Sequence, residues 1–195
     1  MADDGQTLDM RAYRSLKRTM LADLKGLVLE IGAGGGANFQ YFPAGTRWVG
    51  LEPGRLRGRR LARIAVRHGH PPDVLGAVAE HIPLADGSVD AVVSSVVLCS
   101  VDDQDRALAE IRRVLRPGGA FVFVEHVAAP VGTLPRRVQQ ALAPVTRRID
   151  SGCDPSRETW LAIDRAGFAT VDLRWFVRRP AWHLYSPMIA GRATT

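Results

Sequence analysis

A glycine-rich turn follows the first strongly apolar run of the chain, and it is well suited to bind a ligand through its backbone. The run Leu27–Ile31 is typical of a buried strand, and the residues after it read Gly32-Ala33-Gly34-Gly35-Gly36. Glycines permit positive φ and let backbone N–H groups approach a cofactor at the start of the following helix. Glu52 lies about 20 residues further on, where an acid that binds ribose is expected. The segment predicts a nucleotide-like cofactor, and taken alone it also fits a dinucleotide fingerprint.

Polar residues also end the other strands that the sequence predicts. Parallel strands present their carboxyl ends at one edge of a sheet, and open α/β folds bind ligands there. Several carboxylates in one place would repel a pyrophosphate, whereas S-adenosylmethionine carries an ammonium and a sulfonium group and no phosphate. This composition favours a methyl donor over a nicotinamide. The residues concerned are Glu30, Glu52, Glu80, Ser94, Ser95, Glu125 and His126.

The periodicity of apolar residues predicts the elements that position these side chains. Short apolar runs alternate with amphipathic segments, which indicates an α/β fold with a parallel sheet and helices on both faces. Two final strands, separated by a short Pro- and Trp-rich stretch, indicate an antiparallel hairpin. We expect strands at Leu27–Ile31, Arg47–Leu51, Val74–Ala79, Val89–Val93, Ala120–Glu125, Val171–Val177 and Met188–Ala193, and helices at Arg11–Leu24, Arg55–His68 and Asp103–Leu115.

A further helix is predicted between the fifth strand and the hairpin. Apolar residues recur at helical spacing over Leu134–Ile149, although Pro144 interrupts them. We expect residues 128–150 to form an inserted lid over the site. Residues 11–25 are expected to form an N-terminal cap helix, and residues 1–10 to be disordered. The residues that share one face of the predicted lid helix are Leu134, Val138, Leu142, Val145 and Ile149.

Length and composition bound the class of protein. A chain of 195 residues with 46% hydrophobic residues suffices for one domain with a full core, so we expect residues 1–195 to form a single domain. No apolar run approaches the roughly 18 residues of a membrane span, and the two cysteines, Cys99 and Cys153, form no disulfide framework. We expect a cytoplasmic protein. The net charge of +6 comes almost entirely from arginines. Several lie on one predicted helix, which is typical of a solvated face, and we expect no nucleic-acid partner.

Five motifs stand in order along the chain after residue 25. They are the glycine turn with its leading acid Glu30, the pair Glu52-Pro53, the run Ala79-Glu80-x-Ile82-Pro83-Leu84, the turn Asp86-Gly87-Ser88-Val89-Asp90 and the run Leu115-Arg116-Pro117-Gly118-Gly119. In this order and spacing they resemble the class I S-adenosylmethionine-dependent methyltransferases, in the branch that includes the menaquinone and ubiquinone C-methyltransferases. The resemblance implies a Rossmann-like fold with a seven-stranded, mostly parallel sheet, a C-terminal antiparallel hairpin and a helical lid. It also implies S-adenosyl-L-methionine as cofactor, with S-adenosyl-L-homocysteine as product.

The same resemblance implies which residues contact the cofactor. The glycines would wrap the methionine part, Glu52 would bind both ribose hydroxyls, and Ser95 would lie along the methionine tail. The family often has Asp or Asn where Val78 stands, so a side-chain contact to the adenine amine is not expected. Tyr13 either closes over the cofactor or belongs to the apolar face of its helix. The candidate cofactor residues are Tyr13, Glu30, Gly32, Ala33, Gly34, Gly35, Gly36, Glu52, Pro53, Val78, Ala79, Glu80 and Ser95.

Other segments carry a closer resemblance. They are Leu98-Cys99-Ser100-Val101, Glu125-His126-Val127, Ser151-Gly152-Cys153-Asp154, Ser156-Arg157-Glu158-Thr159-Trp160, Pro180-x-Trp182 and Pro187-x-Ile189-x-Gly191. These look like the methyltransferase-like alkyl thiol methyltransferases of animals. The resemblance makes Cys99, Cys153, Asp154, Arg157 and Trp182 candidate substrate-binding residues. His126 is a candidate catalytic residue or a structural hydrogen-bonding group, and Asp154 or Ser156 alternatively caps a helix.

The expected function is methylation of a small molecule, with a thiol as the preferred acceptor. A thiol is already a few per cent ionised at neutral pH, which suits a site without an obvious strong base. O- or C-methylation of a phenolic or quinone-type metabolite is the alternative reaction, and a regulatory module that binds S-adenosylmethionine is the alternative without catalysis. The pair His68 and His70 has no further ligand within helical reach, so no metal site is expected. Monomer and dimer both remain open.

Overall fold

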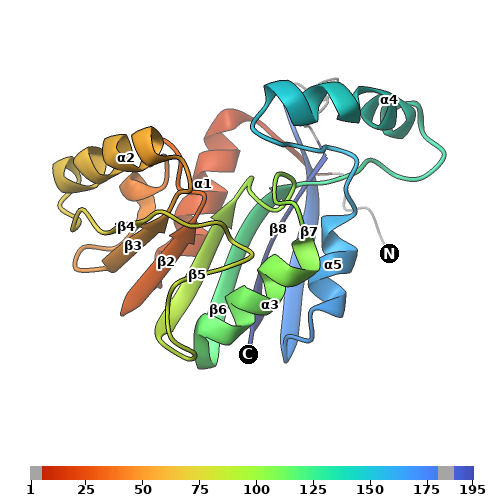
Figure 1. Ribbon diagram of the computed structural model, residues 1–195. Coiled ribbons are helices and arrows are strands. Elements are labelled where there is room, and N and C mark those ends of the chain that lie inside the picture. Colours follow the sequence, from red (N-terminus) through yellow and green to blue (C-terminus); the bar gives the residue numbers. More distant parts are fainter. Residues whose placement is uncertain (1–5, 180–186) are drawn as a thin grey trace.

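The computed structural model describes residues 6–179 and 187–195, which form one mostly parallel sheet (Figure 1). Within these residues the sheet has eight strands in the order β1-β7-β8-β6-β5-β2-β3-β4. β8 runs antiparallel to its neighbours β6 and β7. The expected α/β class and the C-terminal hairpin are confirmed, with eight strands in place of seven. The strands are β1 (Thr7–Leu8), β2 (Leu27–Ile31), β3 (Arg47–Leu51), β4 (Val74–Leu75), β5 (Val89–Ser95), β6 (Leu115–His126), β7 (Thr170–Arg178) and β8 (Pro187–Thr194).

Helices cover both faces of the sheet. Leu29 and Val92 pack on one face with α3 and α5, whereas Val28 and Val93, next to them in the same strands, pack on the other face with α1, α2 and η1. Burial of both faces explains the continuous apolar runs Leu27–Leu29 in β2 and Ala91–Val93 in β5. Within the described residues, no helix has the length and apolar character needed to cross a membrane. The helices are α1 (Met10–Leu21), the 3-10 helix η1 (Phe39–Tyr41), α2 (Arg55–Arg67), α3 (Gln104–Val114), α4 (Leu134–Ile149) and α5 (Thr159–Arg165).

The expectation of disorder over residues 1–10 is wrong for residues 6–10. Thr7 and Leu8 form β1, which pairs in parallel with Val177 and Arg178 of β7. The side chain of Asp9 then caps α1 by accepting a hydrogen bond of 2.8 Å from the backbone N–H of Ala12. The partner strand lies about 170 residues away along the chain, so no local pattern could reveal this pairing.

α1 packs on the sheet. Leu16 is buried in a cluster with Val124 of β6 and Phe176 of β7, and Leu21 is buried in the cluster that contains Trp48. The helix expected as a cap over residues 11–25 therefore contributes to the core. α1 covers a part of the sheet that would otherwise face water.

Several of the predicted element bounds are wrong. α1 ends at Leu21 and not at Leu24, β5 continues to Ser95, and β6 begins five residues before Ala120. The strand expected at Val74–Ala79 corresponds to β4, which ends at Leu75. The last ladder bond joins the N–H of Glu52 to the carbonyl of Leu75 at 3.0 Å. The next donor on that side of β3 would be the N–H of Gly54, which is bonded to Oε1 of Glu52 instead. The helix expected to end at Leu115 ends at Val114, and Leu115 already begins β6. At the other end of this helix, Asp103 serves as the N-cap.

α4 has the predicted bounds but buries a different face from the apolar one that the sequence predicted. Its buried residues are Gln139, Ala143 and Thr146, whereas Leu134 and Ile149 of the apolar stripe are 72% and 78% exposed. Gln139 accepts a hydrogen bond from the N–H of Ala129 and donates one to the carbonyl of Val127, both in the segment after β6. Figure 1 shows α4 across one end of the sheet. Polar contacts rather than the apolar stripe thus attach this helix.

Replacement of Leu8 by Ala tests whether the N-terminal strand is docked. Leu8 is 7% exposed, so the variant should lower the free energy of unfolding by roughly 2–3 kcal/mol, as expected for a truncated buried leucine. Leu56→Ala is the matched control, because Leu56 is 79% exposed and its loss should change stability by less than about 0.5 kcal/mol. Urea unfolding followed by circular dichroism measures both. Equal stability of the two variants would contradict the docking of β1.

Candidate active site

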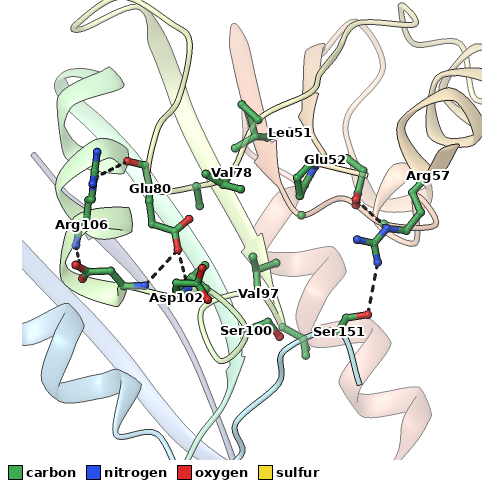
Figure 2. A pocket seen from close by; sticks show the side chains of 18 residues that line it. Leu51, Glu52, Arg57, Val78, Glu80, Val97, Ser100, Asp102, Arg106 and Ser151 are labelled. Carbon is green, nitrogen blue, oxygen red and sulfur yellow. Dashed lines mark hydrogen bonds and ion pairs between the residues drawn. The ribbon is translucent and has the colours of Figure 1, made fainter. Parts of the chain in front are cut away.

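A cavity of about 530 Å³ opens where β2, β3 and β5 end (Figure 2). This is the carboxyl edge of the parallel strands, the edge that the sequence predicted as the site. Its wall combines main chain, acidic groups and apolar side chains, and the volume is ordinary for a small-molecule site. The residues that line it include Gly32, Gly34, Leu51, Glu52, Arg57, Val78, Ala79, Glu80, Val96, Val97, Ser100, Asp102, Arg106 and Ser151.

The glycine turn after β2 forms part of this wall through its main chain. Gly32 has a φ of +55°, and a Cβ there would lie 2.6 Å from a methyl group of Val97. Gly36 has a φ of +72°, and a Cβ there would lie 2.4 Å from the ring of Phe39. Gly32 and Gly34 line the cavity, whereas Ala33 is buried in the core cluster on the other side of the turn. The turn therefore brings bare backbone to the cavity at Gly32 and Gly34.

Glu52 stands at the end of β3 and is nearly buried, with 5% of its surface exposed. Its Oε1 accepts a hydrogen bond of 3.0 Å from the N–H of Gly54 and forms an ion pair of 2.9 Å with Nε of Arg57. Both contacts, which are with described residues, involve Oε1. Oε2 can therefore accept hydrogen bonds from a ligand in the cavity. Glu52 is thus a fixed acceptor, which agrees with its predicted position at the ribose.

Residues 77–80 leave the sheet after β4 and cross the cavity. Val78 is 46% exposed and lies with Leu51 and Ala79 in the wall, so this part of the cavity is apolar. Glu80 also lines the cavity, but its carboxylate accepts hydrogen bonds from the N–H groups of Asp102 at 2.7 Å and Asp103 at 3.2 Å. The side chain of Glu80 therefore holds the loop that precedes α3, as Figure 2 shows.

The turn after β5 separates the cavity from the interior. Val96, which follows Ser95, has a φ of +60°, a strained conformation for a β-branched residue. The buried carboxylate of Glu125 accepts hydrogen bonds from the N–H groups of Val97 at 2.9 Å and Leu98 at 3.1 Å, and from the hydroxyl of Ser94. Burial raises the pKa of Glu125 to about 7 against the effect of these bonds. Residues 96–98 are thereby held in place beside the cavity.

Glu30 and Tyr13, two of the predicted cofactor residues, lie away from the cavity wall. Glu30 is 2% exposed and accepts hydrogen bonds from Asn38 Nδ2 at 2.7 Å and Trp48 Nε1 at 2.8 Å. Burial raises the pKa of Glu30 to about 7, although both hydrogen bonds oppose this. Tyr13 packs near Phe176 with ring centroids 6.2 Å apart, and burial raises its pKa to about 12. The buried ammonium of Lys17 lies 5.8 Å from the ring of Tyr13.

Cys99, His126 and Cys153 come together from three separate segments. The two Sγ atoms are 3.2 Å apart, and Sγ of Cys153 lies 4.0 Å from Nδ1 of His126. All three side chains are buried, and the contact with Cys153, followed by burial, raises the pKa of the Cys99 thiol. The spacing of these residues along the sequence gave no reason to expect a metal site, yet the fold collects a group that could ligate one.

Asp154 and Arg157 hold the loops around this cluster. Asp154 is 2% exposed and accepts hydrogen bonds from the N–H of Ser156 at 2.9 Å and its hydroxyl at 2.7 Å, together with an ion pair from Arg147. Burial alone would raise the pKa of Asp154, but the Ser156 and Arg147 contacts hold it below its usual value. Arg157 donates to the carbonyl of Val101 at 2.5 Å. Trp182, the remaining substrate candidate, lies outside the described residues.

Sequence reasoning missed several residues of the cavity wall. Arg57 links both sides of the opening, because it pairs with Glu52 and its Nη1 lies 3.5 Å from Oγ of Ser151 in the loop after α4 (Figure 2). Arg106 donates from Nε to the carbonyl of Glu80 at 3.1 Å. A local signal existed for Arg57, since it stands in the first turn of the helix that follows Glu52. Ser151 comes from the far end of α4, so no spacing rule could place it here.

The groups around the cavity fit S-adenosylmethionine. A bare backbone cradle at Gly32 suits a polar amino-acid tail, and the fixed acceptor Glu52 suits ribose hydroxyls. The apolar wall at Leu51, Val78 and Ala79 suits an adenine ring. A pyrophosphate would instead face the carboxylates of this wall. The geometry agrees with the methyl donor that the sequence predicted.

Comparisons with known proteins give the same result. A family model described as a methyltransferase domain matches residues 29–123. Thiol S-methyltransferase TMT1A of Homo sapiens is 41% identical over 169 residues, which cover 85% of this chain and 69% of that protein. Thiol S-methyltransferase TMT1B of Homo sapiens is 38% identical and covers 94% of this chain and 80% of that protein. The chain belongs to the class I S-adenosylmethionine-dependent methyltransferases.

A solved structure supports the fold of this methyltransferase. A SAM-dependent methyltransferase from Thermotoga maritima superposes with a TM-score of 0.63 at 23% identity, covering 92% of this chain and 88% of that one. At this level of identity the likeness concerns the fold. The expected family, enzyme class and cofactor are confirmed, and the individual roles of the site residues remain predictions.

Glu30→Gln tests the buried acid behind the glycine turn. The folded-state pKa of Glu30 is raised from 4.5 to about 7, so between these pH values the folded state binds more protons than the unfolded state. The free energy of unfolding should therefore fall as pH rises through this window, by roughly 1–3 kcal/mol for this group. Glutamine removes that dependence. Oδ1 of Asn38 is buried and has no hydrogen-bond partner among the described residues. If the Asn38 amide flips, this oxygen can accept a hydrogen bond from the amide of the new glutamine.

The measurement is urea unfolding at pH 5, 6, 7 and 8 for the wild type and Glu30→Gln. Asp164→Asn is the matched control, because it also removes one carboxylate but from an exposed position. The wild type and the control should lose stability with rising pH more steeply than Glu30→Gln. The same slope for all three proteins would show that Glu30 does not titrate in this window.

Proposed function

We propose that this methyltransferase transfers the methyl group of S-adenosylmethionine to the sulfur of a small, largely apolar thiol. The observation that carries the proposal is the identity of 38–41% with two thiol S-methyltransferases over 85–94% of the chain. The cavity supports it, because an apolar wall adjoins the fixed acceptor Glu52. S-adenosylmethionine supplies an electrophilic methyl group, and the protein orients the acceptor for in-line attack.

The cofactor end of the proposed site comprises the residues after β2, β3 and β4. Glu52 accepts hydrogen bonds from the ribose hydroxyls through Oε2, while Arg57 and the N–H of Gly54 hold its other oxygen. Val78 and Ala79 pack against adenine. The backbone at Gly32 and Gly34 faces the amino-acid tail. Each of these contacts orients the methyl donor without a proton transfer.

The acceptor end comprises the turn after β5 and the loop after α4. Val97, Ser100, Val101 and Ser151 line the cavity there, so apolar and hydroxyl groups surround the acceptor. A thiol has an ordinary pKa near 8.5 and is partly ionised at neutral pH, whereas a phenol with a pKa near 10 depends more on a base. A wall of apolar and hydroxyl groups can orient an acceptor but offers no strong base, and this suits a thiol.

Glu52→Ala tests the cofactor site. Loss of a charged acceptor should weaken binding of S-adenosylhomocysteine by about 1.5–3 kcal/mol, which is a factor of roughly 10–150 in the dissociation constant. Isothermal titration calorimetry measures this, with Asp164→Asn as the control that removes an exposed carboxylate elsewhere. NAD should give no binding heat in any of the three proteins. Unchanged affinity in Glu52→Ala would contradict the assignment of the ribose contact.

A panel of acceptors tests the reaction. Matched aryl and alkyl thiols, phenols and amines are incubated with the protein and cofactor carrying a labelled methyl group, and the products are identified by mass spectrometry. The thiols should give S-methyl products at least about tenfold faster than the matched phenols or amines, because they supply more nucleophile at neutral pH. Faster methylation of a phenol would instead support O-methylation. No product from any acceptor would support a binding module.

A further inference from the structure

Three side chains that can ligate a metal meet in the interior next to the proposed acceptor site. Cys99 follows β5, His126 ends β6, and Cys153 follows α4. Their donor atoms all lie within 4.8 Å of one another, and each residue is at most 8% exposed. Two thiols and an imidazole form a set of ligands that suits a thiophilic metal such as zinc.

The distances suit a tetrahedral ion. Zinc binds sulfur at about 2.3 Å and nitrogen at about 2.0–2.1 Å, so neighbouring ligand atoms lie roughly 3.4–3.8 Å apart. The two Sγ atoms are 3.2 Å apart, and Sγ of Cys153 and Nδ1 of His126 are 4.0 Å apart. Shifts of a few tenths of an ångström would reach the tetrahedral spacing. Two thiolates also neutralise the charge of Zn²⁺, which a buried site requires.

The loops that carry the two cysteines are fastened to each other by their backbones. The N–H of Asp154 donates to the carbonyl of Cys99 at 2.9 Å. Gly152 has a φ of +88°, and a Cβ there would lie 2.9 Å from the carbonyl oxygen of Ser100, so glycine permits the close approach. The guanidinium of Arg157 also donates a hydrogen bond to the carbonyl of Val101. The positions of Cys99 and Cys153 are therefore set by the fold before any ion binds.

Two residues close in sequence to the cysteines belong to the cavity wall. Ser100, next to Cys99, and Ser151, two residues before Cys153, both line the cavity, and Figure 2 shows them together at one side. Among the described residues, the cluster comprises three ligands and no fourth. Three protein ligands with one open position are typical of catalytic zinc sites, whereas structural sites have four.

We propose that Cys99, His126 and Cys153 bind a zinc ion whose fourth position takes the sulfur of the acceptor thiol. This inference rests on the proposed S-methylation. The acceptor thiol releases its proton to water as it binds the ion, and its sulfur lone pair attacks the methyl carbon of S-adenosylmethionine. The bond from that carbon to the sulfonium sulfur breaks, and its electron pair stays on the sulfur of neutral S-adenosylhomocysteine. The product is a neutral thioether, a weaker ligand than a thiolate, and it leaves.

Metal binding is tested first, without reference to activity. The full chain is reduced, freed of metal with a chelator, dialysed and titrated with Zn²⁺ or Co²⁺. We expect one zinc ion per chain by plasma mass spectrometry, and with cobalt a thiolate-to-metal charge-transfer band and the visible absorption of a tetrahedral ion. Cys99→Ala, Cys153→Ala and His126→Gln should each lower the zinc affinity at least tenfold. His81→Gln is the matched control, because it removes an exposed histidine outside the cluster.

Each variant is checked by calorimetry with S-adenosylhomocysteine, so that loss of metal is read only from folded protein. If a cysteine variant fails to fold, His126→Gln and the cobalt spectrum of the wild type decide the question. Failure of the reduced wild type to retain zinc, or equal zinc content in His126→Gln and His81→Gln, would overturn the proposal. A Cys99–Cys153 disulfide whose reduction yields no metal-binding protein would overturn it as well.

The role of the ion is tested by the dependence of rate on pH. With zinc bound, thiol methylation should already reach its plateau below the acceptor's own pKa near 8.5, and the metal-free protein should follow the ionisation of the free thiol. Identical profiles would overturn the role of the ion and leave thiol methylation intact. Methylation of phenols but not thiols by both forms would overturn the proposed function itself.

Discussion

The buried carboxylate of Glu125 is the constraint on which the site depends. It is the second-to-last residue of β6 and accepts hydrogen bonds from Ser94 in β5 and from the backbone of Val97 and Leu98 in the turn after β5. This turn includes Val96, whose left-handed conformation is costly and needs such support. One face of the turn lines the cavity, and the chain then continues into Cys99. A single buried acid thus fixes the boundary between the cofactor site and the cysteine cluster.

The central part of the fold could be predicted from the sequence because its signals are local. β2 and β3 match the expected bounds, and α4 begins and ends at the predicted residues. β1 could not be predicted, since Leu8 has meaning only beside β7. The direction of the α4 apolar face was also beyond local reasoning, because Gln139 finds buried hydrogen-bond partners and so occupies the inner face. Hydrophobic periodicity locates a helix, but polar tertiary contacts decide which side is buried.

The candidate site also contains residues that local sequence signals place and residues that only the tertiary structure places. The glycine turn and Glu52 follow their own strands, so strand-end reasoning places them at the cavity. Glu30 also belongs to a strand end, but its side chain points into hydrogen bonds with Asn38 and Trp48, which spacing cannot show. The cysteine cluster joins residues 54 positions apart in the chain. The resemblance to thiol methyltransferases selected both cysteines, and the fold brings their sulfur atoms to 3.2 Å from each other.

A structure of the complex with S-adenosylhomocysteine tests the central claim most directly, which is that the edge formed by the glycine turn, Glu52 and the turn after β5 holds the methyl donor. Both ribose hydroxyls should lie within hydrogen-bond distance of Glu52, with adenine against Val78 and Ala79. The thioether sulfur should face residues 97–100, on the side of Cys99. A nucleoside bound elsewhere, or a thioether directed away from that turn, would contradict the account.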